Sequence, residues 1–448
     1  MSRRTQLRLA AREIFAEALR AVDAGTAIRN AVRIEASSLT VCISPVELTP
    51  QRPIYSIAIG KAAVAMALAL DEVLSDRLVA GIIAGPSLVS AISFDQHAGR
   101  RWRYFEGGHP LPDENSLAAA RAAFALLERA NEQHALVMFL ISGGGSAMME
   151  WPINDEITLD DSRAANQTLV KCGASIAEIN AVRRKFSTVK GGRLMARAPD
   201  CKQVTLIVSD VPTDHERDVA SGPTLAPAVN APDAAEVVAR YDLRDKLPSS
   251  ILQAIDKRQS LPELPTQPDY FVLLDNDVAL KTAQTAALQR GFAAEIAQDI
   301  SDEQIEVGCG KLMKNLVSLS SSADGSNDAA RVCLISGGEF ACPVRGDGIG
   351  GRNLETALRL AIAADRDHGM REFVALCAGT DGIDGNSPAA GAIVDRTTVE
   401  RARRIGLDPI DFLNRSDAYS FFVALGDAIT TGPTGTNVRD VRILLSSQ

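Results

Sequence analysis

The sequence has no excess of basic residues, which excludes a large class of partners. Lys and Arg number 47 against 56 Asp and Glu, so the formal net charge is −9. Proteins that bind nucleic acid broadly need a basic face to meet the phosphate backbone. We therefore expect no nucleic-acid partner.

Paired cysteines and long apolar runs are also missing. The seven cysteines are scattered, odd in number and without a C-x-x-C pair, so neither a disulfide framework nor a zinc site is expected. No apolar run reaches the roughly 18 residues that cross a membrane. The first 22 residues favour an amphipathic helix over a signal peptide, because Glu13 and Glu17 interrupt the apolar stripe. These features predict a cytoplasmic protein without a membrane partner.

The sequence does contain a regular alternation of strand-like and helix-like segments. Continuous apolar runs, typical of strands covered on both faces, alternate with helical patterns. The expected strands are 54–59, 79–84, 135–141, 204–208, 270–274, 332–335 and 373–377, and the expected helices are 61–74, 114–130, 276–290 and 354–364. This order favours α/β domains with largely parallel sheets. A chain of 448 residues exceeds one ordinary core. Because prolines become more frequent between residues 222 and 268, we place two domains at 1–262 and 263–448.

Four glycine-rich stretches stand out: SGGGSAMM (142–149), KGGR (190–193), GDGIGGRN (346–353) and TGPTGTN (431–437). Glycine lets main-chain N–H groups approach a ligand closely, and such turns at strand ends suit anionic groups, phosphates above all. The first stretch offers Ser142, Gly143, Gly144, Gly145 and Ser146 as phosphate ligands. A tight turn before a helix would have the same sequence.

Charged residues accompany these turns. Lys61 in IGKAAVAM (59–66) follows an expected strand, where an ammonium favours phosphate, although a solvated lysine at a helix start fits equally. No G-x-x-x-x-G-K-[ST] match exists, which excludes a P-loop enzyme. Lys190, followed by Gly191 and Gly192, lies in a basic segment that suggests an anion site or, alternatively, an exposed helical face.

Carboxylates and a histidine follow other strands. Asp210 comes just past an expected strand, where it could accept a hydroxyl proton, hold Mg²⁺ or cap a helix. Asp381, in a glycine-rich turn, is a candidate metal ligand or a structural turn residue. His109, within EGGHPLPDENS (106–116), fits either a polar contact with a ligand or a packed turn.

The stretch at 346–353 also formally satisfies G-x-G-x-x-G through Gly346, Gly348 and Gly351. No convincing first strand precedes it, and no acidic residue follows at the required distance, so the match is weak. Arg352 is more informative, since a guanidinium grips phosphate or carboxylate in a bidentate manner.

The combination and order of these motifs resemble the class II glycerate 2-kinase family, also called the DUF4147/MOFRL family. The motifs that carry the resemblance are IGKAA (59–63), EGGHPLPDENS (106–116), SGGGSA (142–147), N-x-VRRK-x-S-x-VKGGRL (180–194), SDVPTD…ASGPT (209–224), SGGE (336–339), GGRN-x-E (350–355), GTDGIDG (379–385), AAGAIVD (389–395) and TGPTGTNV-x-D (431–440). They span nearly the whole chain.

The resemblance implies a fold and an activity. The fold is α/β, with two three-layer domains: an N-terminal Rossmann-like domain with a mostly parallel sheet, and a C-terminal domain with a mixed sheet that contains the MOFRL segment (about 331–445). The active site is expected between them. The activity is phosphorylation of D-glycerate at the 2-hydroxyl, with ATP and Mg²⁺, to give 2-phosphoglycerate.

The family's catalytic Lys, Asp and Arg fall on Lys61, Asp210 and Arg352. We assign the turn from Ser142 to Ser146 and Lys190, Gly191 and Gly192 to the nucleotide phosphates. His109, Arg352 and Asn353 are assigned to the substrate, and Asp381 to the metal.

Two other functions stay open from the sequence. The first is an NAD(P)H-dependent hydroxypyruvate reductase, whose support is the weak glycine match at 346–351. The second is a non-catalytic nucleotide sensor, which has little need for lysine, carboxylate and arginine together. The sequence also leaves open whether the chain forms a homo-oligomer.

Overall fold

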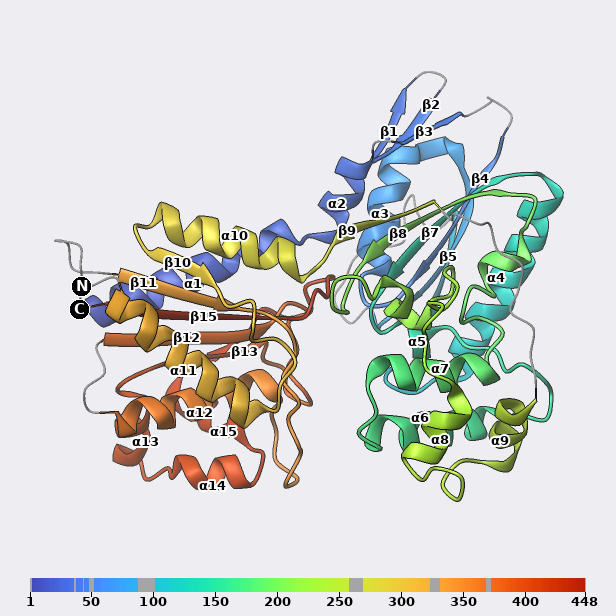
Figure 1. The fold of residues 1–448 in the computed structure, drawn as a ribbon. Helices are drawn as coiled ribbons and strands as arrows, with labels where there is room; N and C mark the ends of the chain where they lie inside the picture. Colours follow the sequence, from blue (N-terminus) through green and yellow to red (C-terminus); the bar gives the residue numbers. More distant parts are fainter. Residues whose placement is uncertain are drawn as a thin grey trace. The chain divides into compact units, whose positions relative to one another are not determined.

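The computed structural model describes residues 2–35, 38–42, 44–47, 52–87, 101–257, 269–322, 331–367 and 372–447. They form two compact units (Figure 1). The N-terminal unit is Ala24–Leu274, and the C-terminal unit combines Met1–Asp23 with Asp275–Gln448. The boundary predicted between residues 262 and 263 lies outside the described residues.

A parallel sheet of six strands forms the centre of the N-terminal unit. Its strands are β4 (Ile54–Ile59), β5 (Leu78–Gly85), β6 (Trp102–Glu106), β7 (Leu136–Ser142), β8 (Lys202–Val208) and β9 (Asp269–Leu274). They lie in the order β6-β5-β4-β7-β8-β9. This is the strand order of dinucleotide-binding folds, which bind ligands where the order reverses. Here the reversal lies between β4 and β7.

Helices cover both faces of this sheet, which explains why every residue of the central strands β4 and β7 is buried. On one face, Tyr55, Ile57 and Phe139 pack with Ala119 and Ala123 of α4 (Glu114–Glu132). Helix α3 (Ala63–Leu74) contacts β4, β5 and β7, and Figure 1 shows it on the other side of the sheet from α4.

The remaining elements of the N-terminal unit lie around this layered core. A small antiparallel sheet is formed by β1 (Val32–Glu35), β2 (Ser38–Val41) and β3 (Ser44–Glu47), and the 3₁₀ segments are Ser75–Arg77, Met195–Arg197 and Glu216–Ser221. The remaining helices are α2 (Ala24–Ala31), the short α5 (Gly145–Met148), α6 (Leu159–Lys171), α7 (Ile176–Phe186), α8 (Ala234–Arg240) and α9 (Ser249–Asp256). These last four helices share a hydrophobic core of their own.

The C-terminal unit has a mixed sheet of six strands. They are β10 (Ala293–Ile296), β11 (Arg331–Ser336), β12 (Glu372–Gly379), β13 (Gly391–Asp395), β14 (Ala428–Ile429) and β15 (Asp440–Ser447), in the order β10-β11-β15-β12-β13-β14. Helices α1 (Arg3–Ala21) and α10 (Asn276–Gln289) lie on one face of this sheet, and α11 (Ile305–Ser322), α12 (Arg352–Arg366), α13 (Thr398–Arg404), α14 (Pro409–Asn414) and α15 (Ala418–Leu425) lie on the other (Figure 1).

The predicted fold class is confirmed, with one correction to the expectation drawn from the alternating pattern. That pattern favoured largely parallel sheets, which holds for the N-terminal unit. Among the described residues of the C-terminal unit, only β10 and β11 pair in parallel. The reason is that β15 enters between β11 and β12 directly from a loop, without a crossover helix, and so runs antiparallel to both. The mixed sheet implied by the family resemblance is observed.

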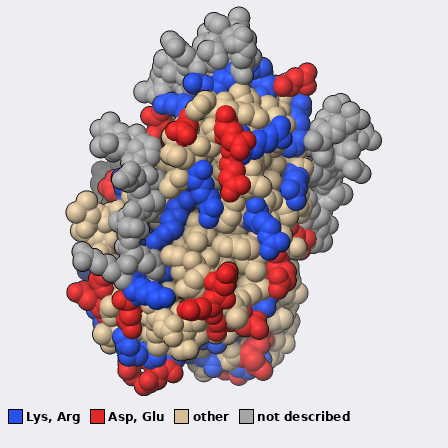
Figure 2. All heavy atoms as spheres, turned by 90° about the vertical axis from the view of Figure 1, so that its right-hand side faces the viewer, with Lys and Arg blue, Asp and Glu red and all other residues tan. Residues whose placement is uncertain are grey.

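The described surface carries both signs of charge. On the face shown in Figure 2, Lys and Arg side chains are interspersed with Asp and Glu. Within the described ranges, no helix combines the length and the apolar character that crossing a membrane requires.

Candidate active site

The glycine-rich turn after β7 is joined to the end of β4 at the point where the strand order reverses. The main-chain N–H of Lys61 donates to the Gly143 carbonyl at 2.8 Å. The Ser142 hydroxyl accepts from the Ala62 N–H at 3.0 Å and donates to the Ile59 carbonyl at 3.1 Å. The two predicted motifs IGKAA and SGGGSA therefore form one fixed structure.

Three predicted side chains gather around this turn. A Cβ atom added at Gly143 would overlap the carboxylate of Asp210, which follows β8. A Cβ atom at Gly144 would lie 3.1 Å from Cγ of Lys61 and 3.4 Å from Nε2 of His109. The structure thus brings together residues that follow four different strands. The absence of side chains at Gly143 and Gly144 is what allows this approach.

The KGGR segment, by contrast, has partners within the protein. The Lys190 ammonium is 1% exposed and forms an ion pair with Glu150. Burial lowers the pKa of Lys190, and the charge of Glu150 opposes that shift. The N–H groups of Gly191 and Gly192 donate to the carbonyls of Ser221 (3.2 Å) and Gly222 (2.7 Å). These contacts give all three residues a structural role, and their binding of nucleotide phosphates stays a prediction.

Arg352 begins α12 in the C-terminal unit and is held by two carboxylates. Its guanidinium donates to Asp440 through Nε (2.7 Å) and Nη2 (3.1 Å), and Nη2 lies 2.7 Å from Glu339. Burial acts to lower the pKa of Arg352, but these charges outweigh it and raise the pKa. The Arg352 side chain stays 35% exposed, so its guanidinium is oriented and still accessible.

Asn353 is buried behind Arg352. Its amide donates to Asp440 at 2.9 Å, and its main-chain N–H donates to Asp384 at 3.1 Å. Asn353 therefore helps to orient Asp440, and its contact with substrate stays a prediction. Sequence reasoning did not single out Asp440, although this residue closes the TGPTGTNV-x-D motif.

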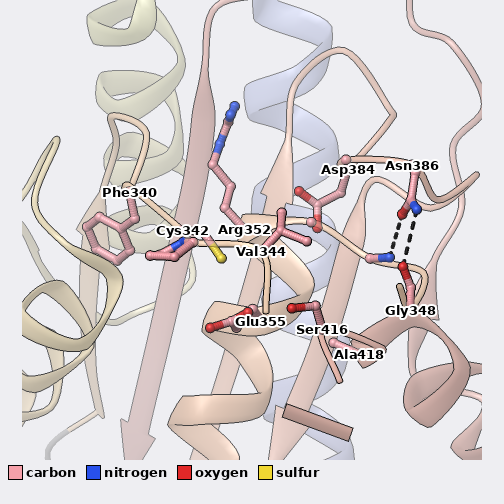
Figure 3. A pocket seen from close by; sticks show the side chains of 14 residues that line it. Phe340, Cys342, Val344, Gly348, Arg352, Glu355, Asp384, Asn386, Ser416 and Ala418 are labelled. Carbon is pink, nitrogen blue, oxygen red and sulfur yellow. Dashed lines mark hydrogen bonds between the residues drawn. The ribbon is translucent and has the colours of Figure 1, made fainter. Parts of the chain in front are cut away.

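A pocket of about 400 Å³ lies beside Arg352 within the C-terminal unit. Figure 3 shows Phe340, Cys342 and Val344 on one part of its wall and Asp384 and Asn386 on another. Burial raises the pKa of Asp384 to about 7. Its carboxylate accepts hydrogen bonds from the main-chain N–H groups of Asn353 and Leu354 in α12, and these bonds oppose the rise. Asn386 bonds to Gly348 and Gly350 and so fixes the loop that carries the G-x-G-x-x-G match.

That loop does not have the context of a dinucleotide-binding turn. In such a turn the glycines follow a strand directly and open the helix of a parallel βαβ unit. Gly346 lies ten residues beyond Ser336, the last residue of β11, and the sheet is mixed. The G-x-G-x-x-G match therefore gives no structural support for a reductase.

Asp381 lies in the turn after β12, where its carboxylate accepts from the Ile383 N–H at 3.1 Å. Among the residues that the structure describes, no group of three or more His, Cys, Asp or Glu side chains could hold a metal ion. A Mg²⁺ ion in kinases needs only one or two carboxylates besides the phosphates of the nucleotide. A single carboxylate such as that of Asp381 is compatible with that requirement.

Comparison with known proteins gives the chain its family. Residues 10–256 match the family described as a domain of unknown function (DUF4147), and residues 332–440 match the MOFRL family. The chain is 36% identical to the D-glycerate 2-kinase of Thermotoga maritima, over 86% of this chain and 89% of that protein. It is 37% identical, over 95% of both chains, to an Agrobacterium vitis protein provisionally named a hydroxypyruvate reductase.

A solved structure agrees with this result. The crystal structure of a glycerate kinase from Thermotoga maritima superposes with a TM-score of 0.79 and 32% identity, covering 99% of this chain and all of the other. The resemblance predicted from ten ordered motifs is thus confirmed, and the chain belongs to the DUF4147/MOFRL family of glycerate 2-kinases.

Proposed function

We propose that this protein transfers the γ-phosphoryl group of ATP to the 2-hydroxyl of D-glycerate and releases 2-phosphoglycerate and ADP. The observation that carries the proposal is the approach of Asp210 and Lys61 to one glycine turn at the reversal point of a parallel sheet. Phosphoryl transfer needs positioned charges and little covalent chemistry, and this arrangement supplies them.

Asp210 is the candidate base. Its carboxylate would accept the proton of the attacking hydroxyl, so that the oxygen can bond to phosphorus as the bond from phosphorus to the leaving oxygen breaks. Lys61 would neutralise the charge on the migrating phosphoryl group. The main-chain N–H groups of the turn from Gly143 to Ser146 would hold nucleotide phosphates.

Arg352 and His109 are candidate substrate ligands. His109 contacts the same glycine turn as Lys61. Arg352 presents an accessible, permanently charged guanidinium whose orientation is fixed by Asp440. It suits the glycerate carboxylate or a phosphate group, either of which can accept hydrogen bonds from a guanidinium.

Mg²⁺ would neutralise the phosphate oxygens when it is bound with the nucleotide, and Asp381 is the candidate protein ligand. The rest of the proposed chemistry belongs to residues of the chain.

A coupled assay with ATP, Mg²⁺ and D-glycerate tests the proposal, with the product isomer identified by NMR. We expect ADP release that depends on glycerate and accumulation of the 2-phosphate. Formation of the 3-phosphate would contradict the assigned position. Oxidation of NADH in the presence of hydroxypyruvate, without ADP release from the kinase mixture, would overturn the proposal in favour of a reductase.

A further inference from the structure

Three successive residues after the predicted base have a left-handed backbone. The φ angles are +52° at Ala220, +62° at Ser221 and +67° at Gly222. Residues other than glycine avoid this conformation, because the Cβ atom then approaches the following carbonyl oxygen too closely. Strain of this kind persists where the surrounding contacts hold the segment.

Those contacts come from two directions. The carbonyls of Ser221 and Gly222 accept from the N–H groups of Gly191 and Gly192, as described above. The buried Ser221 hydroxyl lies 2.7 Å from the hydroxyl of Ser146 and 2.7 Å from Oδ1 of Asn180. Ser221 therefore connects α7 to the glycine turn that follows β7.

Chemistry fixes the direction of these hydrogen bonds. The Asn180 Nδ2 group faces the carbonyl of Asp218 at 3.1 Å and its carboxylate at 3.3 Å, and both can only accept. Asn180 Oδ1 must then face Ser221, which donates its one hydroxyl proton to that oxygen. Ser146 consequently donates to Ser221. The only hydroxyl proton of Ser146 is used within the protein.

The far end of this series is anchored by charge. Arg184 donates to the Asp218 carboxylate at 2.6 Å, and both side chains are about nine-tenths buried. The contacts thus run from Arg184 through Asp218, Asn180 and Ser221 to Ser146, within the N-terminal unit.

We propose that Ser221 is a positioning residue that fixes Ser146, and with it the turn from Gly143 to Ser146, in the conformation that binds the nucleotide phosphates. The proposal rests on the proposed function for the identity of the ligand. It assigns phosphate contact to the main-chain N–H groups of the turn and none to the Ser146 hydroxyl.

Titration calorimetry with ADP and Mg²⁺ tests this, using the variants Ser146→Ala, Ser221→Ala and the double variant. Each single change should raise the Kd for ADP about 3–10-fold, since each removes the same hydrogen bond. The double variant should lose little more than Ser221→Ala alone, because residues that act through one contact are not additive. In the kinase assay the KM for ATP should rise while the KM for D-glycerate stays constant.

Ser162→Ala is the matched control, because Ser162 is also buried and donates to a carbonyl, that of Thr158, at 3.2 Å. It should leave the Kd for ADP unchanged. If Ser221→Ala does not fold, Ser221→Gly replaces it, since glycine accepts a φ of +62° without steric cost.

An unchanged Kd for ADP in the Ser221 variant, or losses that add fully in the double variant, would overturn the positioning role. ADP binding requires no glycerate. A wild-type protein that binds ADP with the expected pattern among variants, yet phosphorylates no glycerate, would therefore refute the proposed function and leave this inference standing.

Discussion

At the scale of single residues, the carboxylate of Asp210 lies against Gly143, the first glycine of the turn after β7. Asp210→Asn keeps the shape but removes the capacity to accept a proton. We expect kcat to fall about 10²–10⁴-fold, the range for loss of a general base, with unchanged stability to denaturant. The coupled assay and urea unfolding measure the two quantities.

Asp214→Asn is the matched control for this change, because Asp214 is an exposed residue of the same loop and asparagine tolerates its φ of +69°. It should retain wild-type kcat. Activity near wild type in Asp210→Asn would remove Asp210 from the role of base.

Asp384 gives a second prediction at this scale, on stability as a function of pH. Burial raises its pKa in the folded protein to about 7, above the ordinary value of 3.8. The folded state therefore holds a proton that the unfolded state has lost between about pH 4 and pH 7, and stability must fall as pH rises through that window. An asparagine amide at this position cannot titrate, so the Asp384→Asn variant should be more stable relative to wild type at pH 8 than at pH 5.

Urea unfolding of both proteins at the two pH values measures this difference. The exposed Asp245→Asn serves as control and should show a difference from wild type that does not change with pH. An Asp384→Asn difference that is equally independent of pH would contradict the raised pKa.

At the scale of elements, the glycine turn after β7 combines a backbone requirement with a packing requirement. Gly144 has a φ of +79° and lies against Lys61 and His109. Gly144→Ala should lose about 1–2 kcal/mol of stability, because alanine is strained at this φ. It should also displace both side chains and lower kcat/KM by at least about tenfold.

Gly173→Ala separates the two effects. Gly173 has nearly the same φ, +82°, but no heavy atom lies within 4 Å of where its Cβ would be. This variant should lose similar stability and keep full activity. Equal loss of activity in both variants would show that backbone strain alone, and not crowding of Lys61 and His109, explains the effect.

Elements of the parallel sheet could be predicted from the sequence because each is specified locally. Residues 54–59 form a strand as expected, since a short run of six successive buried residues is typical of a strand covered by helices on both faces. Sequence reasoning missed β15 (Asp440–Ser447), although all of its residues are buried. No local pattern in this segment indicates that it inserts between β11 and β12, which lie far earlier in the chain. Long-range pairing of this kind is a property of the sheet, not of the segment.

The same distinction applies to the candidate site. Lys61, His109 and Asp210 follow strands whose ends meet at one edge of a parallel sheet, so the sequence could place them together. Lys190 and Asn353 have the residue types of ligands but are buried against Glu150 and Asp440. Their partners lie 40 and 87 positions away in the chain, and no local pattern reveals such pairs.

At the scale of the whole molecule, the first helix belongs to the unit formed by the end of the chain. Leu7 and Ile14 of α1 are buried, and the helix packs on α10, β12 and β15. Arg8 pairs with Asp395 at 2.6 Å and with Asp427 at 2.5 Å, and both carboxylates are 3% exposed. The C-terminal unit therefore depends on residues that precede the entire N-terminal unit in the chain.

Arg8→Ala should destabilise the C-terminal unit selectively, by roughly 1–3 kcal/mol, because it leaves two buried carboxylates with fewer partners. Both tryptophans, Trp102 and Trp151, lie in the N-terminal unit. Tryptophan fluorescence therefore follows that unit alone, while far-UV circular dichroism follows both. In urea, the circular dichroism of the variant should begin to fall at a lower concentration than in wild type, and the fluorescence transition should stay at the same concentration.

Arg3→Ala, an exposed change on the same helix, should alter neither signal. If the fluorescence transition of Arg8→Ala moved together with its circular dichroism, the two units would unfold as one, and the stability of each could not be assigned to its own contacts.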